Sequence, residues 1–348
     1  MSSSVNGKST AGESGDGQLA AADQPVIEIQ NLSRLFKTTK AVDDLSFRVH
    51  PGQVFGFIGP NGAGKTTTMR ILATLDTPTS GHAWVDGFSV VDDPDRVRRR
   101  LGFMPDGFGT YPNVDCEEYL DFFARSYGLR GAERRNALKK VMEFTQLDRL
   151  ARKPVDGLSK GMKQRLCLGR ALIHDPSVLI LDEPAAGLDP RARIELREMI
   201  VALAADGKAL LISSHILTEL AEMCDRVAII EKGKLLAVGT VDEILSGSPA
   251  TSLTAEANAT VALSKTCVVE IGILSDLDQA EKFLESKFND AHVSRQSNRL
   301  ALEIEGDENV HADLLESMIN HGIRVSRFAV KERSLEDAFL KVTKGLVQ

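Results

Sequence analysis

Val54-Phe-Gly-Phe-Ile-Gly-Pro-Asn-Gly-Ala-Gly-Lys-Thr66 is the stretch of sequence that decides the fold. Its first five residues are continuously apolar, which predicts a buried strand. The rest matches the pattern GxxxxGK[ST] completely, and Thr67 to Leu75 can form the helix that follows. In this order of elements, backbone N–H groups converge on phosphate oxygens at a helix N-terminus. We therefore expect a nucleotide phosphate site here.

Two residues of this loop are expected to do most of its chemistry. Lys65 is predicted to bridge the β- and γ-phosphates, and Thr66 to bind Mg²⁺ through its hydroxyl. The glycines let the backbone approach the phosphates closely. The predicted nucleotide-binding residues of the loop are Gly59, Pro60, Asn61, Gly62, Ala63, Gly64, Lys65, Thr66 and Thr67.

A second apolar run, Val178 to Leu181, ends in two acidic residues. Asp182 is expected to hold Mg²⁺, and Glu183 to polarise the attacking water as a general base. Two acids after an apolar run are also typical of a solvated strand end. Downstream of Lys65, the pair favours the catalytic interpretation of a phosphate-loop NTPase.

Leu158-Ser-Lys-Gly-Met-Lys-Gln-Arg165, shortly before Asp182, narrows the class of protein. A serine and a glycine at the start of a predicted helix make a second anion-binding corner in the chain. With this stretch the sequence resembles the ATP-binding cassette (ABC) family over about 220 residues, from Val26 to Leu245. The family carries its LSGGQ signature here. Ser159 and Gly161 are kept, whereas lysine and methionine occupy the third and fifth positions.

The resemblance implies roles for four more residues. Phe36 matches the position from which family members stack an aromatic ring on adenine; the alternative is a packed core residue. Asp106 stands where the family has the Q-loop glutamine, and although shorter and charged it can still approach Mg²⁺ or its water. Asp189 corresponds to the acid of the D-loop. His215 corresponds to the switch histidine that contacts the γ-phosphate.

The predicted fold class is α/β, with a phosphate-loop NTPase core. By resemblance, this core carries an antiparallel β subdomain and a helical signature subdomain. Alternating residues at Val26–Leu32 and Val42–Val49 predict strands with one buried face, and Ala209–Ile212 predicts a further buried strand. The spacing of apolar residues between about Asp115 and Leu172 is helical.

The chain divides into four predicted segments. Residues 1–24 have the composition of a disordered tail, 25–245 form the ATPase domain, 246–265 a linker, and 266–348 a small α+β accessory domain. We found no catalytic constellation in this last segment, whose pattern indicates a β-α-β-α-β order. Its predicted strands are 268–273, 300–304 and 323–330, and its predicted helices are 277–287, 310–319 and 335–342.

Composition excludes several classes of protein. Acidic residues number 49 and basic residues 42, so the net charge of −7 argues against a nucleic-acid partner. No stretch reaches the roughly 18–20 apolar residues that span a bilayer. The four cysteines lack disulfide or zinc spacing, which favours a reducing, cytoplasmic setting. By resemblance, the chain is expected at the inner face of the cell membrane.

The family's working principle implies partners. One cassette's signature completes the phosphate site of another, so a single copy of each motif implies a head-to-tail homodimer that binds ATP and Mg²⁺. An integral-membrane permease is the other expected partner, docking around Asp106 to Tyr119. The basic run Arg96–Arg100 is read as a solvated helix face, with anionic lipid as its alternative.

The C-terminal ending favours export. Ser334-Leu-Glu-Asp-Ala-Phe339 resembles the ending of cassettes from exporter-type and drug-resistance-type systems. A dimer-stabilising or regulatory appendage is an equal interpretation of the C-terminal segment.

Non-transport ABC ATPases are the alternative function. DNA-maintenance members separate the two motifs by a long coiled coil, and no heptad run lies between Lys65 and Ser159. Ribosome-associated translation factors normally carry two cassettes. A binding module with a dead site is disfavoured by the intact catalytic residues.

Overall fold

The computed structural model describes residues 24–107, 109, 111, 113–246, 266–288, 293–296, 299–305, 308–332 and 335–336. Nearly all of the predicted tail and linker, and residues 337–342 of the predicted last helix, lie outside these ranges.

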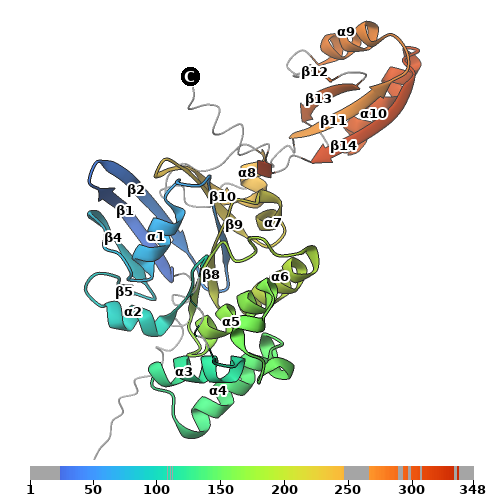
Figure 1. Ribbon diagram of the computed structural model, residues 1–348. Helices are drawn as coiled ribbons and strands as arrows, with labels where there is room; N and C mark the ends of the chain where they lie inside the picture. The colour runs from blue at the N-terminus through green and yellow to red at the C-terminus, as the bar shows by residue number, and fades with distance from the viewer. Residues whose placement is uncertain are drawn as a thin grey trace, which may run out of the picture.

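A six-stranded, mostly parallel sheet forms the centre of the larger region (Figure 1). The strands β9, β3, β8, β7 and β6 are parallel, so their carboxyl ends meet at one edge, where ligands bind in open α/β sheets. The three predicted buried strands are all present. In sheet order the strands are β10 (Lys234–Thr240), β9 (Arg226–Glu231), β3 (Val54–Ile58), β8 (Ala209–Ser214), β7 (Val178–Asp182) and β6 (Leu101–Met104).

An antiparallel sheet covers one face of the central sheet. The Phe47 ring stacks on Phe55 of β3 with ring centroids 5.0 Å apart, which joins the two sheets in one core. Helices α1 (Lys65–Leu72) and α2 (Pro94–Arg100) belong to this layer, and α1 begins two residues earlier than predicted. The antiparallel strands are β1 (Ile27–Phe36), β2 (Thr39–Val49), β4 (Ser80–Val85) and β5 (Phe88–Ser89).

Helices cover the other face. Successive residues of β7 point to opposite faces, so Val178 and Ile180 join the core beneath the antiparallel sheet, and Leu179 and Leu181 join the helical core. The predicted helical stretch is interrupted by short 3₁₀ turns at Asp148–Leu150 and Val155–Gly157. The helices are α3 (Cys116–Ser126), α4 (Gly131–Phe144), α5 (Lys160–Leu172), α6 (Pro190–Ala205), α7 (Leu217–Ala221) and α8 (Val241–Ser246).

The C-terminal module, residues 266–332, is a four-stranded antiparallel sheet with two helices packed on one face, whereas Leu335 beyond it is buried in the core of the larger region. One strand, β12, was not predicted, because Val293-Ser-Arg-Gln296 has a single apolar residue and no visible alternation. The observed order is therefore β-α-β-β-α-β. Its elements are β11 (Thr266–Ile273), α9 (Leu277–Lys287), β12 (Val293–Gln296), β13 (Arg299–Glu305), α10 (Glu308–Asn320) and β14 (Val325–Glu332).

No helix in the described ranges has the length and apolar character needed to cross a membrane.

Candidate functional site

The glycine-rich loop between β3 and α1 has two positions, Gly59 and Gly64, that leave no room for a side chain. Gly64 has a φ of +105°, and a Cβ there would stand 2.3 Å from the carbonyl oxygen of Ala41. A Cβ on Gly59 would stand 2.4 Å from the carbonyl oxygen of Ile230. The loop therefore keeps its backbone bare at the N-terminus of α1, which suits an anionic ligand.

Lys65 holds a positive charge at the end of this loop. Its side chain is 6% exposed, and Nζ donates to the carbonyl oxygens of Gly59 at 2.6 Å and Pro60 at 3.4 Å. A buried ammonium with mainly backbone acceptors fits a site that takes an anion. The next residue, Thr66, is exposed at the first turn of α1 and presents its hydroxyl to ligands.

The two acidic residues at the end of β7, Asp182 and Glu183, have different surroundings. Asp182 is 1% exposed, and its Oδ1 accepts a hydrogen bond from Ser213 Oγ at 2.6 Å. Glu183 has a φ of +50°, a left-handed conformation uncommon for a residue with a side chain. The same Ser213 hydroxyl accepts the N–H of Glu183 at 2.9 Å, which supports this turn.

Glu183 lies between two cationic or potentially cationic groups. Its Oε1 is 3.5 Å from Lys65 Nζ, and its Oε2 is 2.7 Å from His215 Nδ1. The backbone N–H of His215 also donates to Oε2, at 3.3 Å. The three predicted catalytic residues, which follow three different strands (β3, β7 and β8), are thus brought together.

The residues present also suit Mg²⁺. Thr66 offers an exposed hydroxyl and Asp182 a buried carboxylate, and such hard oxygen ligands are those that Mg²⁺ prefers. Asp106 is exposed just beyond the end of β6, the neighbour of β7, and so lies at the same sheet edge as Asp182.

The signature residues form a second group. Ser159 caps α5, and its side chain accepts the N–H of Met162 at 3.3 Å. Gly161 lies against α6, since a Cβ there would stand 3.3 Å from Ala192 Cβ. Asp189 caps α6 by accepting the Ala192 N–H at 2.9 Å. These described contacts do not include Lys65, Glu183 or His215.

The two remaining predicted nucleotide-binding residues, Phe36 and Thr67, differ in exposure. Phe36, at the end of β1, is 42% exposed, with the Arg34 guanidinium 4.4 Å from its ring centroid, so it is not a core residue. Thr67 is half-buried in the first turn of α1.

Two residues that support the site, Ser213 and Gly233, were not predicted from the sequence. Ser213 joins Asp182 to the backbone of Glu183, and only its place at the end of a buried strand hinted at it. The Gly233 N–H donates to the Ala63 carbonyl at 2.9 Å, while the Gly233 carbonyl accepts the Asp43 N–H at 2.8 Å. The turn between β9 and β10 thereby fastens the glycine-rich loop to the antiparallel sheet.

Comparisons with known proteins agree with this geometry. The ABC transporter family model matches residues 42–186. Nod factor export ATP-binding protein I of Ralstonia nicotianae is 38% identical over 222 residues, covering 64% of this chain and 69% of that protein. The probable multidrug ABC transporter ATP-binding protein YbhF of Escherichia coli is 38% identical over 225 residues, which cover 65% of this chain but only 39% of YbhF.

One relative matches almost end to end. Linearmycin resistance ATP-binding protein LnrL of Bacillus subtilis is 29% identical over 321 residues, covering 91% of this chain and 98% of that protein. Among solved structures, an ATP-binding subunit of an ABC transporter is 33% identical with a TM-score of 0.59, covering 66% of this chain and 96% of that one. The chain therefore belongs to the ABC transporter family, as one of its ATP-hydrolysing subunits.

Proposed function

We propose that this chain powers export through a separate integral-membrane permease, at the inner face of the cell membrane, by hydrolysing MgATP between two copies of itself. The observation that carries the proposal is the convergence of Lys65, Glu183 and His215 beside the glycine-rich loop.

Glu183 is the proposed general base. Contacts to both carboxylate oxygens orient it, and its left-handed backbone turns it away from Asp182, so each acid has a separate task. Lys65 would bind the β- and γ-phosphates, and His215 would contact the γ-phosphate. Mg²⁺ held by Thr66 and Asp182, with Asp106 nearby, would neutralise charge on the phosphates. The loop residues 59–67 would surround the phosphates, and Phe36 would stack on the adenine.

A second copy would complete the site. Ser159 and Gly161 begin α5, whose N-terminal N–H groups offer partial positive charge to an anion. Because these residues lack contacts to their own Lys65 group, we assign them to the partner's γ-phosphate, with Asp189 beside them. Hydrolysis removes the charge that both corners bind, so the closed dimer loses its stabilisation.

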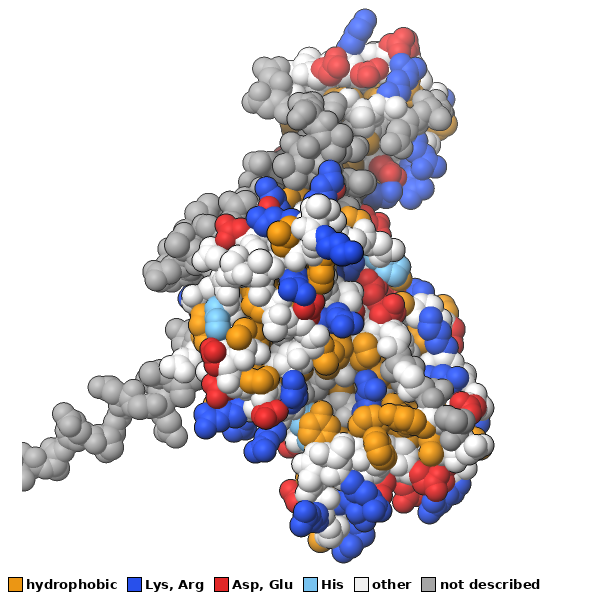
Figure 2. Space-filling model, turned by 60° about the vertical axis from the view of Figure 1, so that its left-hand side comes forward, with side chains coloured by type: hydrophobic (Ala, Val, Ile, Leu, Met, Phe, Trp, Pro, Cys, Tyr) orange, Lys and Arg blue, Asp and Glu red, His pale blue; other side chains and the backbone are white. Residues whose placement is uncertain are grey.

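An aromatic surface in the helical region supports docking of a permease. Tyr111 is 50% exposed and Phe122 is 55% exposed, and their ring centroids lie 5.7 Å apart. Tyr111 also lies 6.2 Å from the buried Tyr119, so a rigid core supports the surface. Figure 2 shows exposed hydrophobic side chains gathered at the height of α3 and α4, among charged ones.

Export is the direction that the relatives support. The names of two relatives include Nod factor export and linearmycin resistance, and the second match extends into the C-terminal module of this chain. We place this module with the transporter's assembly or regulation, because it buries an apolar core and none of its described residues contacts the proposed nucleotide site.

The test is ATP hydrolysis by the full chain with Glu183→Gln and, as a matched control, Glu198→Gln at an exposed position of α6. We expect Glu183→Gln to lose ATPase activity, keep ATP binding and accumulate as an ATP-dependent dimer in light scattering. Glu198→Gln should resemble the wild type. Normal hydrolysis by Glu183→Gln would remove it from the role of base. Reconstitution with a candidate permease tests transport separately.

A further inference from the structure

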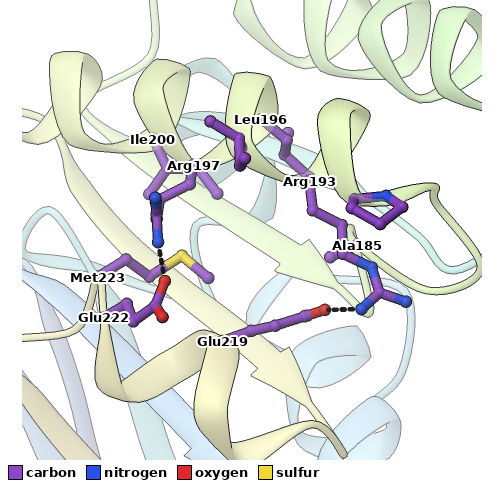
Figure 3. Close-up of a pocket in the computed structure, with 10 residues that line it drawn as sticks. Ala185, Arg193, Leu196, Arg197, Ile200, Glu219, Glu222 and Met223 are labelled. Atoms are coloured by element: carbon purple, nitrogen blue, oxygen red, sulfur yellow. Dashed lines mark ion pairs between the residues drawn. The ribbon is translucent and has the colours of Figure 1, made fainter.

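A groove of about 340 Å³ lies between α6 and α7 (Figure 3). Its apolar lining includes Leu196, Ile200 and Met223. Two ion pairs cross it, each joining an arginine of α6 to a glutamate in or just after α7. The two pairs are one helical turn apart, but their surroundings differ.

The first pair contains an arginine that makes two contacts at once. Arg193 Nε donates to the carbonyl oxygen of Leu188 at 3.0 Å, and its Nη1 lies 3.0 Å from Glu219 Oε1. Leu188 belongs to the Gly187-Leu-Asp-Pro190 loop that follows β7, whereas Glu219 belongs to the helix that follows β8. One planar guanidinium therefore connects the loop after the acid pair to the segment that carries His215.

Glu219 lies within electrostatic reach of the catalytic pair. Burial raises the pKa of Glu219, the charges of Arg193 and His215 lower it, and the charge of Glu183 raises it further. Its side chain is 14% exposed, and neither carboxylate oxygen accepts a hydrogen bond within the described part of the chain. Arg193 is thus the counter-ion of this carboxylate.

The second pair is a natural control within the same groove. Arg197 and Glu222 join the same two helices, and Glu222 is 60% exposed. The described contacts of Arg197 do not include a carbonyl of the Gly187–Pro190 loop. A purely structural contribution from joining α6 to α7 should therefore be shared by both pairs.

We propose that Arg193 and Glu219 are positioning residues for ATP hydrolysis, which keep the loop at Leu188 and the segment at His215 in register. When the loop at Leu188 and the segment at His215 are both fixed in place, the base Glu183 keeps its contact with His215. Asp189 then caps α6 beside the signature residues. The inference rests on the proposed roles of Glu183 and His215. It names the contacts that join the loop after β7 to the segment after β8.

The variants compare the two pairs in the full chain. Arg193→Gln removes the positive charge and the guanidinium donors Nε and Nη1, and Glu219→Gln removes the carboxylate charge. Arg197→Gln and Glu222→Gln are the matched substitutions in the second pair. Arg193→Lys keeps the charge, but an ammonium lacks the planar pair of N–H donors that contact Leu188 and Glu219 at the same time.

The expected result is a change in kcat with nucleotide binding unchanged. Arg193→Gln and Glu219→Gln should each lower kcat by about tenfold, the size of a typical coupling between contacting residues. The KM and the Kd for ATP should stay within about twofold, because Lys65 and the loop still bind the phosphates. Arg193→Lys should recover part of kcat, and both second-pair variants should stay near the wild type.

Three results would overturn the inference: equal kcat losses in both pairs, a loss explained by lower thermal stability, or weaker ATP binding with unchanged kcat. A double variant, Arg193→Gln with Glu219→Gln, should lose no more than either single variant if the pair acts as a unit. If Glu183→Gln hydrolyses ATP normally, the proposed function fails instead, whatever the Arg193 variants show.

Discussion

The nucleotide-binding region, residues 24–246, and the C-terminal module bury different kinds of side chain. The larger region buries polar or charged groups around the carboxyl edge of its central sheet, including Lys65 at the start of α1 and Asp182 and Ser213 near the ends of β7 and β8. Apart from Cys267, the buried core of the described module is made of ordinary apolar side chains such as Val269 and Ile271. Burying a polar group costs free energy unless a partner compensates it. The buried polar groups of the larger region therefore mark where the chain accepts a cost in stability to place reactive groups.

Two lysine–glutamate pairs, one in each region, allow the comparison to be tested by measuring ATPase activity. Lys65 is buried beside Glu183, whereas Lys331 pairs with Glu270 and is 56% exposed. We expect Lys65→Met to lower ATPase activity by roughly 100- to 1000-fold, since it removes a preorganised charge from the phosphates. Lys331→Met should change activity less than about twofold, because an exposed pair contributes little. Steady-state hydrolysis by the full chain measures both.

A similar loss of activity in both lysine variants would contradict the comparison. It would mean that the C-terminal module takes part in hydrolysis. An unchanged melting temperature in Lys65→Met is the control that separates lost chemistry from lost folding.

The apolar core of the module allows a test of whether the module can be destabilised without loss of ATPase activity. Ile271 is fully buried in β11, so Ile271→Ala should destabilise the module by about 2–5 kcal/mol. Hydrogen exchange should rise in β11 and β13, while the fluorescence transition of Trp84, the single tryptophan, stays where it is in the wild type. ATPase activity of the isolated chain should also stay the same. A shifted Trp84 transition would show that the two regions unfold as one unit.

The Ser213 hydroxyl tests the site's supporting contacts. Ser213→Ala removes the donor to Asp182 and the acceptor for the Glu183 N–H. We expect kcat to fall about 10- to 100-fold, as for other residues that orient metal ligands. Ser275→Ala is the matched control, since this module hydroxyl also accepts a backbone N–H, from Arg324 at 3.2 Å. If both variants keep full activity, Ser213 has no role in orienting the acid pair.

Local patterns in the sequence were enough to find the strand β3, the glycine-rich loop and the helix α9, whose predicted and observed bounds agree at Leu277–Lys287. Such features depend on residues close together in the chain. The Arg193–Glu219 pair and the Ser213 bridge were not predicted, because they depend on which strands become neighbours. The short strand β12 was missed because its pairing with β13 compensates for a pattern too weak to read.

His174 is a half-buried polar group of the larger region that lies outside the proposed site, so it tests whether every such group serves catalysis. Its ring stacks on Tyr127 with centroids 3.7 Å apart, and its Nε2 lies 3.2 Å from the Leu101 carbonyl oxygen. Burial lowers the pKa of His174 from 6.5 to about 4. The described contacts of His174 include none of the proposed site residues, so we expect His174→Phe to leave ATPase activity nearly intact.

The effect of His174 should instead appear in the pH dependence of stability. The folded chain keeps the imidazole neutral down to about pH 4, whereas the unfolded chain takes up a proton near pH 6.5. Lowering the pH from 7 to 5.5 should therefore remove about 1 kcal/mol of stability that His174→Phe does not lose. Urea unfolding followed by Trp84 fluorescence measures this difference. His321→Phe, at an exposed histidine of the module, is the matched control. An equal loss in wild type and His174→Phe would mean that His174 is not kept neutral by burial, and the group would then need another explanation within the larger region.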